Sequence, residues 1–194
     1  MTPVYKLSAN SVRNGRTVYG SMLAGNTAFL PTSFESIATV TVGSGGAANI
    51  EFTSIPATYS HLQIRGIARS SGGANWFAVQ LNGNAPTKTH TLEGNGSAVG
   101  ADSHSIGQMV TSSQTADVFS ASIIDILDYA STNKNKTVRC LTGRDVNGSG
   151  GQINLTSEFL DNTAAITSIK LLPDISTNFA QYSHFALYGI KGAA

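Results

Sequence analysis

The four histidines are the residues best suited to bind a metal ion or to move a proton, since imidazole titrates near neutral pH. They are His61, His90, His104 and His184, and the nearest two lie fourteen residues apart. No pair has the short spacing, such as H-x-x-x-H, that places two imidazoles beside one zinc ion. His61 and His184 begin two predicted strands on their polar side, where histidines at a sheet rim are common. The histidines therefore predict no metal site.

Two carboxylates and one loop are the other candidates for chemistry. Acid–base catalysis needs a positioned pair with separated pKa values. Asp125 and Asp128 are the nearest candidates, but an offset of three places them on opposite faces of a strand, and only a helical turn would make them neighbours. The segment 143–152 has Asp145 and Asn147 two apart, as in calcium loops, yet it lacks the third acidic position and the terminal Glu. We interpret it as a hairpin turn.

One cysteine and one tryptophan complete the set. Cys140 is the only cysteine, which excludes an internal disulfide, and its alternation with Val138 and Thr142 predicts a buried residue rather than a reactive thiol. Trp76 could stack on a sugar ring and is a candidate for surface recognition, although packing at the core or sheet edge is the favoured alternative. We predict no catalytic residue, no metal, no cofactor and no enzymatic activity.

The composition is polar without being charged. Charged residues make up 12% of the 194 residues, the formal net charge is +1, and Ser and Thr contribute roughly a fifth of the chain. The most basic stretch holds Lys134, Lys136, Arg139 and Arg144 beside acidic residues, and we expect a solvated loop and strand face there. These features argue against nucleic-acid binding. The sequence also contains neither an apolar run long enough to cross a membrane nor an N-terminal signal-peptide core.

Hydrophobic alternation predicts an all-β domain over residues 34–194. "FESIATVTV" and "NIEFTSI" flank the turn "GSGGAA" and predict a hairpin, while "HLQIRGIA" and "NWFAVQL" alternate along two further strands. "VFSASIIDILDYAS" fits a helical turn or a strand, and its β-branched residues favour the strand. The segment from Thr87 to Met109 is expected to be loop-like with one short strand. Nine or ten short strands predict an antiparallel β-sandwich, with a jelly roll as the leading topology.

Residues 1–33 hold no steady period and predict an extended N-terminal arm for anchoring or assembly. Short apolar pairs interrupt its polar sequence, which suggests packing on another surface, although a flexible leader is the alternative. The pairs are Val4 with Tyr5, Val18 with Tyr19, and Met22 with Leu23.

One strand pattern occurs twice. "YSHLQIRG" starts at Tyr59 and "YSHFALYG" starts at Tyr182, and each places a Gly at the same offset. A Gly inside a strand marks a bulge or a close approach of backbones. We expect the two strands to be neighbours under similar packing demands; internal duplication is the alternative.

Three blocks carry a resemblance to a known group of proteins. "FESIATVTVGSGGAANIEFTSIPATYSHLQIRGIARSS", "DILDYASTNKNKTVR" and "FAQYSHFALYGIKG" resemble uncharacterised virion-associated proteins of tailed phages, including marine phages and cyanophages. The resemblance covers roughly residues 34–192. Its first motif is carried by Ile55, Pro56, Thr58, Tyr59, His61, Leu62, Ile64 and Arg65, and its last by Tyr182 to Ile190.

The resemblance implies a structural β-sandwich of the virion, made in the host cytoplasm, and brings no catalytic residue with it. We expect a capsid decoration or cement protein attached through the arm, with a tail-fibre, tail-tip or receptor-binding module as the alternative and a carbohydrate-binding protein or enzyme as a third. The expected partners are further copies of the chain, with a trimer favoured, and the major capsid protein or tail proteins. A host-surface glycan is a further candidate partner.

Overall fold

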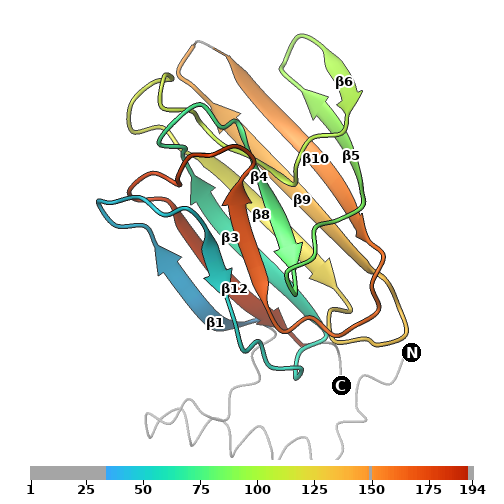
Figure 1. Cartoon of the computed structure of the whole chain (residues 1–194). Helices are drawn as coiled ribbons and strands as arrows, with labels where there is room; N and C mark the ends of the chain where they lie inside the picture. Colours follow the sequence, from blue (N-terminus) through green and yellow to red (C-terminus); the bar gives the residue numbers. More distant parts are fainter. Residues whose placement is uncertain (1–33, 149, 192–194) are drawn as a thin grey trace, which may run out of the picture. The chain divides into compact units, whose positions relative to one another are not determined.

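Two antiparallel β-sheets face each other in the computed structural model, which describes residues 34–148 and 150–191 (Figure 1). The large sheet has eight strands, in the spatial order β1 (Phe34–Thr41), β12 (His184–Ile190), β3 (His61–Ala68), β8 (Ser120–Leu127), β9 (Lys136–Asp145), β10 (Gly151–Leu160), β5 (Lys88–Gly94) and β6 (Val99–Asp102). The small sheet has four, in the order β2 (Ile50–Phe52), β11 (Ile169–Pro173), β4 (Trp76–Leu81) and β7 (Gly107–Gln108). The described residues form no helix, and thus none that could span a membrane.

The chain crosses between the sheets in the manner of a jelly roll. Strands β1, β3, β8 and β12 lie in the large sheet, and the strands that precede or follow them, β2, β4, β7 and β11, lie in the small sheet. The facing orders β1-β12-β3-β8 and β2-β11-β4-β7 are those of two interlocked Greek keys. The predicted jelly-roll-like sandwich is therefore confirmed.

The predicted hairpin over residues 34–55 is wrong. Strand β1 pairs with β12 and strand β2 pairs with β11, so the Gly-rich turn between them carries the chain from one sheet to the other. A short Gly-rich connection is compatible with both arrangements. The choice between them depends on strands more than a hundred residues away.

Two inserted hairpins widen the large sheet beyond the jelly-roll strands. One is β9–β10, and the other is β5–β6, which pairs with β10 along the outer edge. The second insertion lies in the segment expected to be loop-like with one short strand, and that segment contains β5, β6 and β7. The many Gly, Ser and Asn residues of this segment are typical of loops, so its strands could not be recognised from hydrophobic alternation. These strands are held by backbone pairing more than by apolar side chains.

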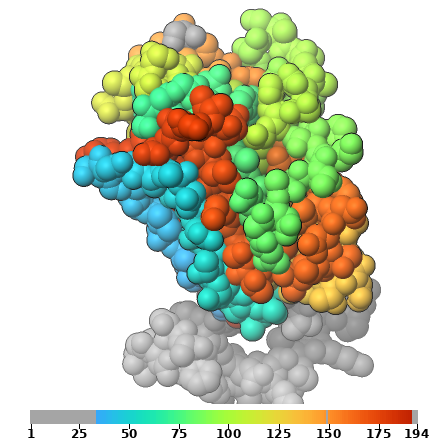
Figure 2. All heavy atoms as spheres, in the orientation of Figure 1, coloured from blue at the N-terminus to red at the C-terminus, as the bar shows by residue number. Residues whose placement is uncertain are grey.

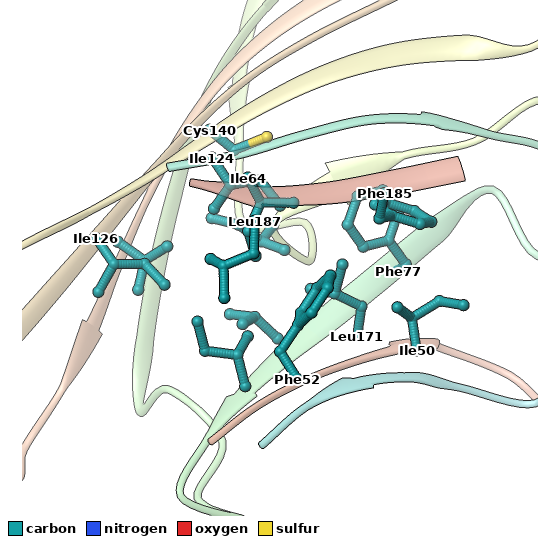
Figure 3. Close-up of a cluster of buried hydrophobic side chains, with 14 of the residues drawn as sticks. Ile50, Phe52, Ile64, Phe77, Ile124, Ile126, Cys140, Leu171, Phe185 and Leu187 are labelled. Carbon is teal, nitrogen blue, oxygen red and sulfur yellow. The ribbon is translucent and has the colours of Figure 1, made fainter. Parts of the chain in front are cut away.

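The core lies between the sheets and is built by strict alternation. On the large sheet Leu62, Ile64, Ile124 and Ile126 point inward, and on the small sheet Phe77 faces them. Figure 3 shows Ile64, Ile124, Ile126 and Phe77 in one cluster of side chains from both sheets, and Leu62 belongs to the same core. Each fully buried aliphatic or aromatic side chain contributes about 1.5 to 3 kcal/mol. A core of this size needs no disulfide or metal.

The two strands with the repeated pattern are direct neighbours, as expected. Strand β12 pairs with β3 antiparallel, with His184 opposite Ile67 and Ile190 opposite His61. His61 and His184 each begin their strand and are partly exposed, which matches their predicted position at the rim.

The basic stretch is not uniformly solvated. Lys136 is completely buried, and its ammonium donates to the carbonyl oxygens of Ser131, Lys134 and Thr163 at 2.6, 2.8 and 3.1 Å. The three N–H groups of the ammonium thus each have a carbonyl acceptor, which offsets the cost of burying its charge. Burial lowers the pKa of this lysine. The expectation of a solvated face is therefore wrong at Lys136.

Candidate functional site

The most unusual surface of the described residues is the outer face of the large sheet, which points away from the small sheet. Among the residues that the structure describes, twelve large hydrophobic side chains are exposed, and all of them except Ile175 and Tyr182 lie on this face. Val99 is 85% exposed and Leu92 is 59% exposed. Figure 2 shows the opposite side of the molecule, where the small sheet and its loops cover the core and the β5–β6 hairpin lies at one margin.

Strand pairing arranges these side chains into two adjacent rows, which we call the apolar band. Each row runs across the sheet through residues that are Cα partners on successive strands. The first row is Ile67, Ala121, Gly143, Ile153, Gly94 and Val99. The second row is Ala186, Arg65, Ile123, Leu141, Leu155, Leu92 and Ala101. Arg65 is the only charged residue in either row.

Small residues hollow the apolar band at two places. A groove of about 520 Å³ lies over Ala121 and Gly143, between the side chains of Ile67, Ile123 and Ile153. A second depression of about 230 Å³ is lined by Leu92, Val99 and Leu155. Ridges of Ile and Leu thus alternate with hollows over Gly and Ala on one face.

A polar row borders the apolar band and is internally paired. Asp125 accepts hydrogen bonds from the amide of Gln63 at 2.8 Å and from the guanidinium of Arg139 at 2.9 Å. The guanidinium of Arg65 lies over the rings of Phe34 and Tyr188, at 5.5 and 5.7 Å from their centroids. Its Nε donates to the Gln63 side-chain oxygen at 2.8 Å. The charges around the band are therefore already satisfied within the chain.

Trp76, the candidate for surface recognition, lies half-buried at the start of β4. Its indole ring stacks on the imidazole of His104, with centroids 4.1 Å apart and planes inclined by 19°. Nε2 of His104 lies 3.1 Å from Asp102 and 3.6 Å from Glu93. Ligand atoms of these three residues lie within 4.8 Å of one another, so they are the group best placed to hold a metal ion among the described residues. The imidazole of His104 contacts both carboxylates directly.

A chain of amides connects this cluster to the interior. The amide of Gln152 donates to Glu93 at 2.5 Å, that of Gln108 to Gln152 at 2.7 Å, and that of Asn154 to Gln108 at 2.9 Å. Beside it, Arg144, Glu93 and Gln152 line a polar pocket of about 380 Å³ under the tips of the β5–β6 and β9–β10 hairpins. Burial lowers the pKa of Arg144, whose Nε makes no hydrogen bond with the residues that the structure describes.

The remaining sequence candidates do not assemble into a reaction centre. Asp125 and Asp128 have separate partners: Asp125 pairs with Arg139, and Asp128 accepts a 2.6 Å hydrogen bond from Lys134. That bond holds the pKa of Asp128 below its usual value. Cys140 is buried, as predicted, and burial raises the pKa of its thiol to about 12.

The suspected calcium loop is a hairpin turn, as predicted. The backbone N–H of Val146 donates to the carbonyl of Gly150 at 3.0 Å, and the N–H of Asn147 donates to the Asp145 carboxylate at 2.9 Å. The candidate assembly residues of the arm, Val4, Tyr5, Val18, Tyr19, Met22 and Leu23, lie outside the described residues.

The apolar band was missed from the sequence although a signal was present. In "SASIIDIL" apolar residues occupy both phases of the strand, with Ile123 and Leu127 on one side and Ile124 and Ile126 on the other. A strand with apolar residues on both sides is typical of a sheet that is covered on both faces.

Searches with the chain found no matching protein-family model, no matching curated protein and no matching solved structure.

Proposed function

We propose that the chain is a non-enzymatic structural protein on the surface of a tailed-phage virion, where it decorates the capsid. The observation that carries the assembly role is the apolar band, a broad hydrophobic surface on a sheet face that the domain itself leaves uncovered. Such surfaces mark sites of protein association. The virion setting comes from the resemblance of the sequence blocks around Tyr59 and Tyr182.

The weak charge of the chain suits this role. Copies that sit close together on a particle would repel each other if each carried a large net charge of one sign, and this chain carries +1. Individually small contacts suffice on a particle, since multivalent attachment raises the effective affinity by orders of magnitude. In this proposal residues 1–33 attach each copy to the capsid and the domain faces outward.

The side chains that could do chemistry have structural partners instead. Cys140 has a pKa of about 12 and is closed off from solvent, which argues against thiol catalysis. Asp125 and Asp128 are each held by a cation on a neighbouring segment. These arrangements support a structural, non-enzymatic role in which the protein binds other components of a particle.

The test is binding of the purified full chain to capsids that lack it. We expect saturable binding and a gain in the temperature or force at which the capsid fails. A truncated chain that lacks residues 1–33 should bind at least tenfold more weakly. Capsids that neither bind the full chain nor gain resistance would contradict the proposal.

A receptor-binding module of the tail is the second candidate, and one local arrangement favours it. Trp76 and His104 form an aromatic pair beside the carboxylates of Glu93 and Asp102, and Glu93 also lines the polar pocket. Aromatic rings with nearby hydrogen-bonding groups are features of sugar sites. Binding to host cells that is lost in Trp76→Ala and kept in His90→Ala would favour this candidate, and a blank glycan array would count against it.

A further inference from the structure

We infer that the large sheets of two copies pack face to face through the apolar band, so that a second copy of this chain covers the surface that the domain leaves exposed. The inference names the partner for the assembly role and rests on the proposed function for its setting on a particle. Its physical basis lies in the size, the relief and the charge of the face.

The size of the face matches a stable interface. Eight strands give seven spacings of about 4.8 Å, and strands of about seven residues are about 23 Å long, so the face covers about 800 Å². Specific interfaces bury about 800 Å² on each partner. The two rows of the apolar band occupy roughly half of this area, and the paired polar row lies beside them, which matches an apolar interface core with a polar rim.

The relief of the face is self-complementary. Ridges formed by Ile123, Leu141 and Ile153 lie beside hollows over Ala121 and Gly143. When two such faces are related by a two-fold axis, the ridges of one copy can enter the hollows of the other. Sheets packed in this way lie about 10 Å apart, with interdigitating side chains.

The charge of Arg65 within the apolar band does not oppose this pairing. Arg65, the one cation of the apolar band, is held by the rings of Phe34 and Tyr188 and by Gln63 of its own copy. It therefore needs no carboxylate from a partner. A partner of different chemistry, such as an acidic protein, would find no unpaired charge in the band to recognise.

The proposed assembly has two-fold symmetry because both copies contribute the same surface, the apolar band. An interface in which both copies contribute the same patch closes as a two-fold dimer, whereas a trimer needs two different patches on each copy. The face predicts a dimer, where the sequence alone favoured a trimer. A mass measurement distinguishes these two states.

The experiment is sedimentation equilibrium of the full chain from 1 to 100 µM, with two variants on the band and one matched control. Leu141 and Leu155 are opposite each other on β9 and β10 and are 46% and 45% exposed, so Leu141→Glu and Leu155→Glu place a charge on the face without burying it in the monomer. Ile175→Glu is the matched control, because Ile175 is 55% exposed and lies off the outer face of the large sheet. Circular dichroism and thermal melting verify that each variant folds. If a band variant does not fold, Leu141→Ser, a smaller polar change on the same face, is measured in its place.

We expect a mass of twice 20.2 kDa for the wild type and for Ile175→Glu, and a rise of about 100-fold or more in the dimer dissociation constant for each band variant. A wild-type monomer at 100 µM overturns the inference. So does a trimer, or a dimer that both band variants leave intact. Capsid binding by the full chain is scored separately, so a monomer that still binds capsids contradicts the pairing alone, and a dimer that ignores capsids contradicts the proposed function alone.

Discussion

The ring of Phe185 on β12 lies directly over Gly66 on the neighbouring strand β3. A Cβ at Gly66 would lie 2.7 Å from Cε1 of that ring and closer still to Cδ1. The reverse arrangement holds at the other end of the strand pair, where a Cβ at Gly189 would lie 2.5 Å from Cδ2 of Tyr59. Each of the two similar sequence patterns therefore supplies a glycine that makes room for an aromatic ring of the other. This reciprocal packing gives a physical reason for the glycine at the same offset in both patterns.

The glycine beneath Phe185 should be intolerant of a side chain. We predict that Gly66→Ala lowers the free energy of unfolding by about 2 to 3 kcal/mol through overpacking. In a double-mutant cycle, Phe185→Leu should relieve at least about 1 kcal/mol of that loss. Gly73→Ala is the matched control, since a Cβ there meets nothing within 4 Å. Urea unfolding measures all four variants, and strictly additive losses at Gly66 and Phe185 would contradict the packing described.

Glu158 should make the stability of the fold fall as the pH rises from about 4.5 to about 7. It is 4% exposed, its Oε1 accepts one long hydrogen bond from Thr89, and burial raises its pKa from 4.5 to about 7. Because the folded-state pKa lies above the unfolded one, the folded state binds more protons between these values. Stability therefore falls as the pH rises through this window, by about 3 kcal/mol in total.

The measurement is the free energy of unfolding from pH 4 to pH 8 for the wild type and for Glu158→Gln. The variant should lose this contribution, so its stability relative to the wild type should improve steadily as the pH rises. Equal slopes for the two proteins over this range would show that Glu158 is not buried as described.

Lys136 should be needed for the loops that it holds. Lys136→Met keeps most of the side-chain volume but removes the donors to the carbonyls of Ser131, Lys134 and Thr163. We predict a loss of about 2 to 4 kcal/mol in unfolding free energy. Lys134→Met, which removes an exposed ion pair with Asp128, should cost less than about 1 kcal/mol. Thermal melting compares the two, and similar losses would contradict the interior role of Lys136.

Cys140 should be inert in the folded protein. Its thiol is buried and has a pKa of about 12, so very little thiolate exists at pH 8 and none of it is accessible. We predict that a thiol reagent labels no cysteine over hours in buffer and one per chain within minutes in denaturant. Rapid labelling of the native protein would place Cys140 at the surface.

Trp76 should report on its stacking partner. Because it is the only tryptophan, His104→Ala should shift the emission of the protein to longer wavelength by opening one face of the indole to water. The exposed His90 on β5 serves as the control, and His90→Ala should leave the spectrum unchanged. An unchanged spectrum in His104→Ala would mean that the two rings do not stack in solution.

Much of the architecture could be predicted from alternation alone. The inward positions of Leu62, Ile64, Phe77 and Val79 follow from period-two patterns, and these patterns fixed the all-β class. The same alternation also carried a signal that was overlooked: Lys136 shares the inward phase of Val138 and Cys140. The alternation therefore indicates that the side chain of Lys136 points inward, although a lysine is rarely buried.

Sheet membership and the outer face could not be predicted in the same way. Which strand pairs with β1 depends on β12, about 150 residues away, and a local turn does not encode that choice. The rows of the apolar band arise from the register of seven strands, so Leu92 and Ile123 become part of one surface only after folding. The cluster of Trp76, His104 and Glu93 likewise joins three segments whose sequence spacing carries no metal or catalytic pattern.

A reconstruction of the purified virion at a resolution that traces strands tests the central claim most directly. We expect the reconstruction to place this chain on the outside of the capsid, with the apolar band of each copy buried against a second copy. A particle from which the chain is absent, or on which the outer face of its large sheet is turned to solvent, would contradict it.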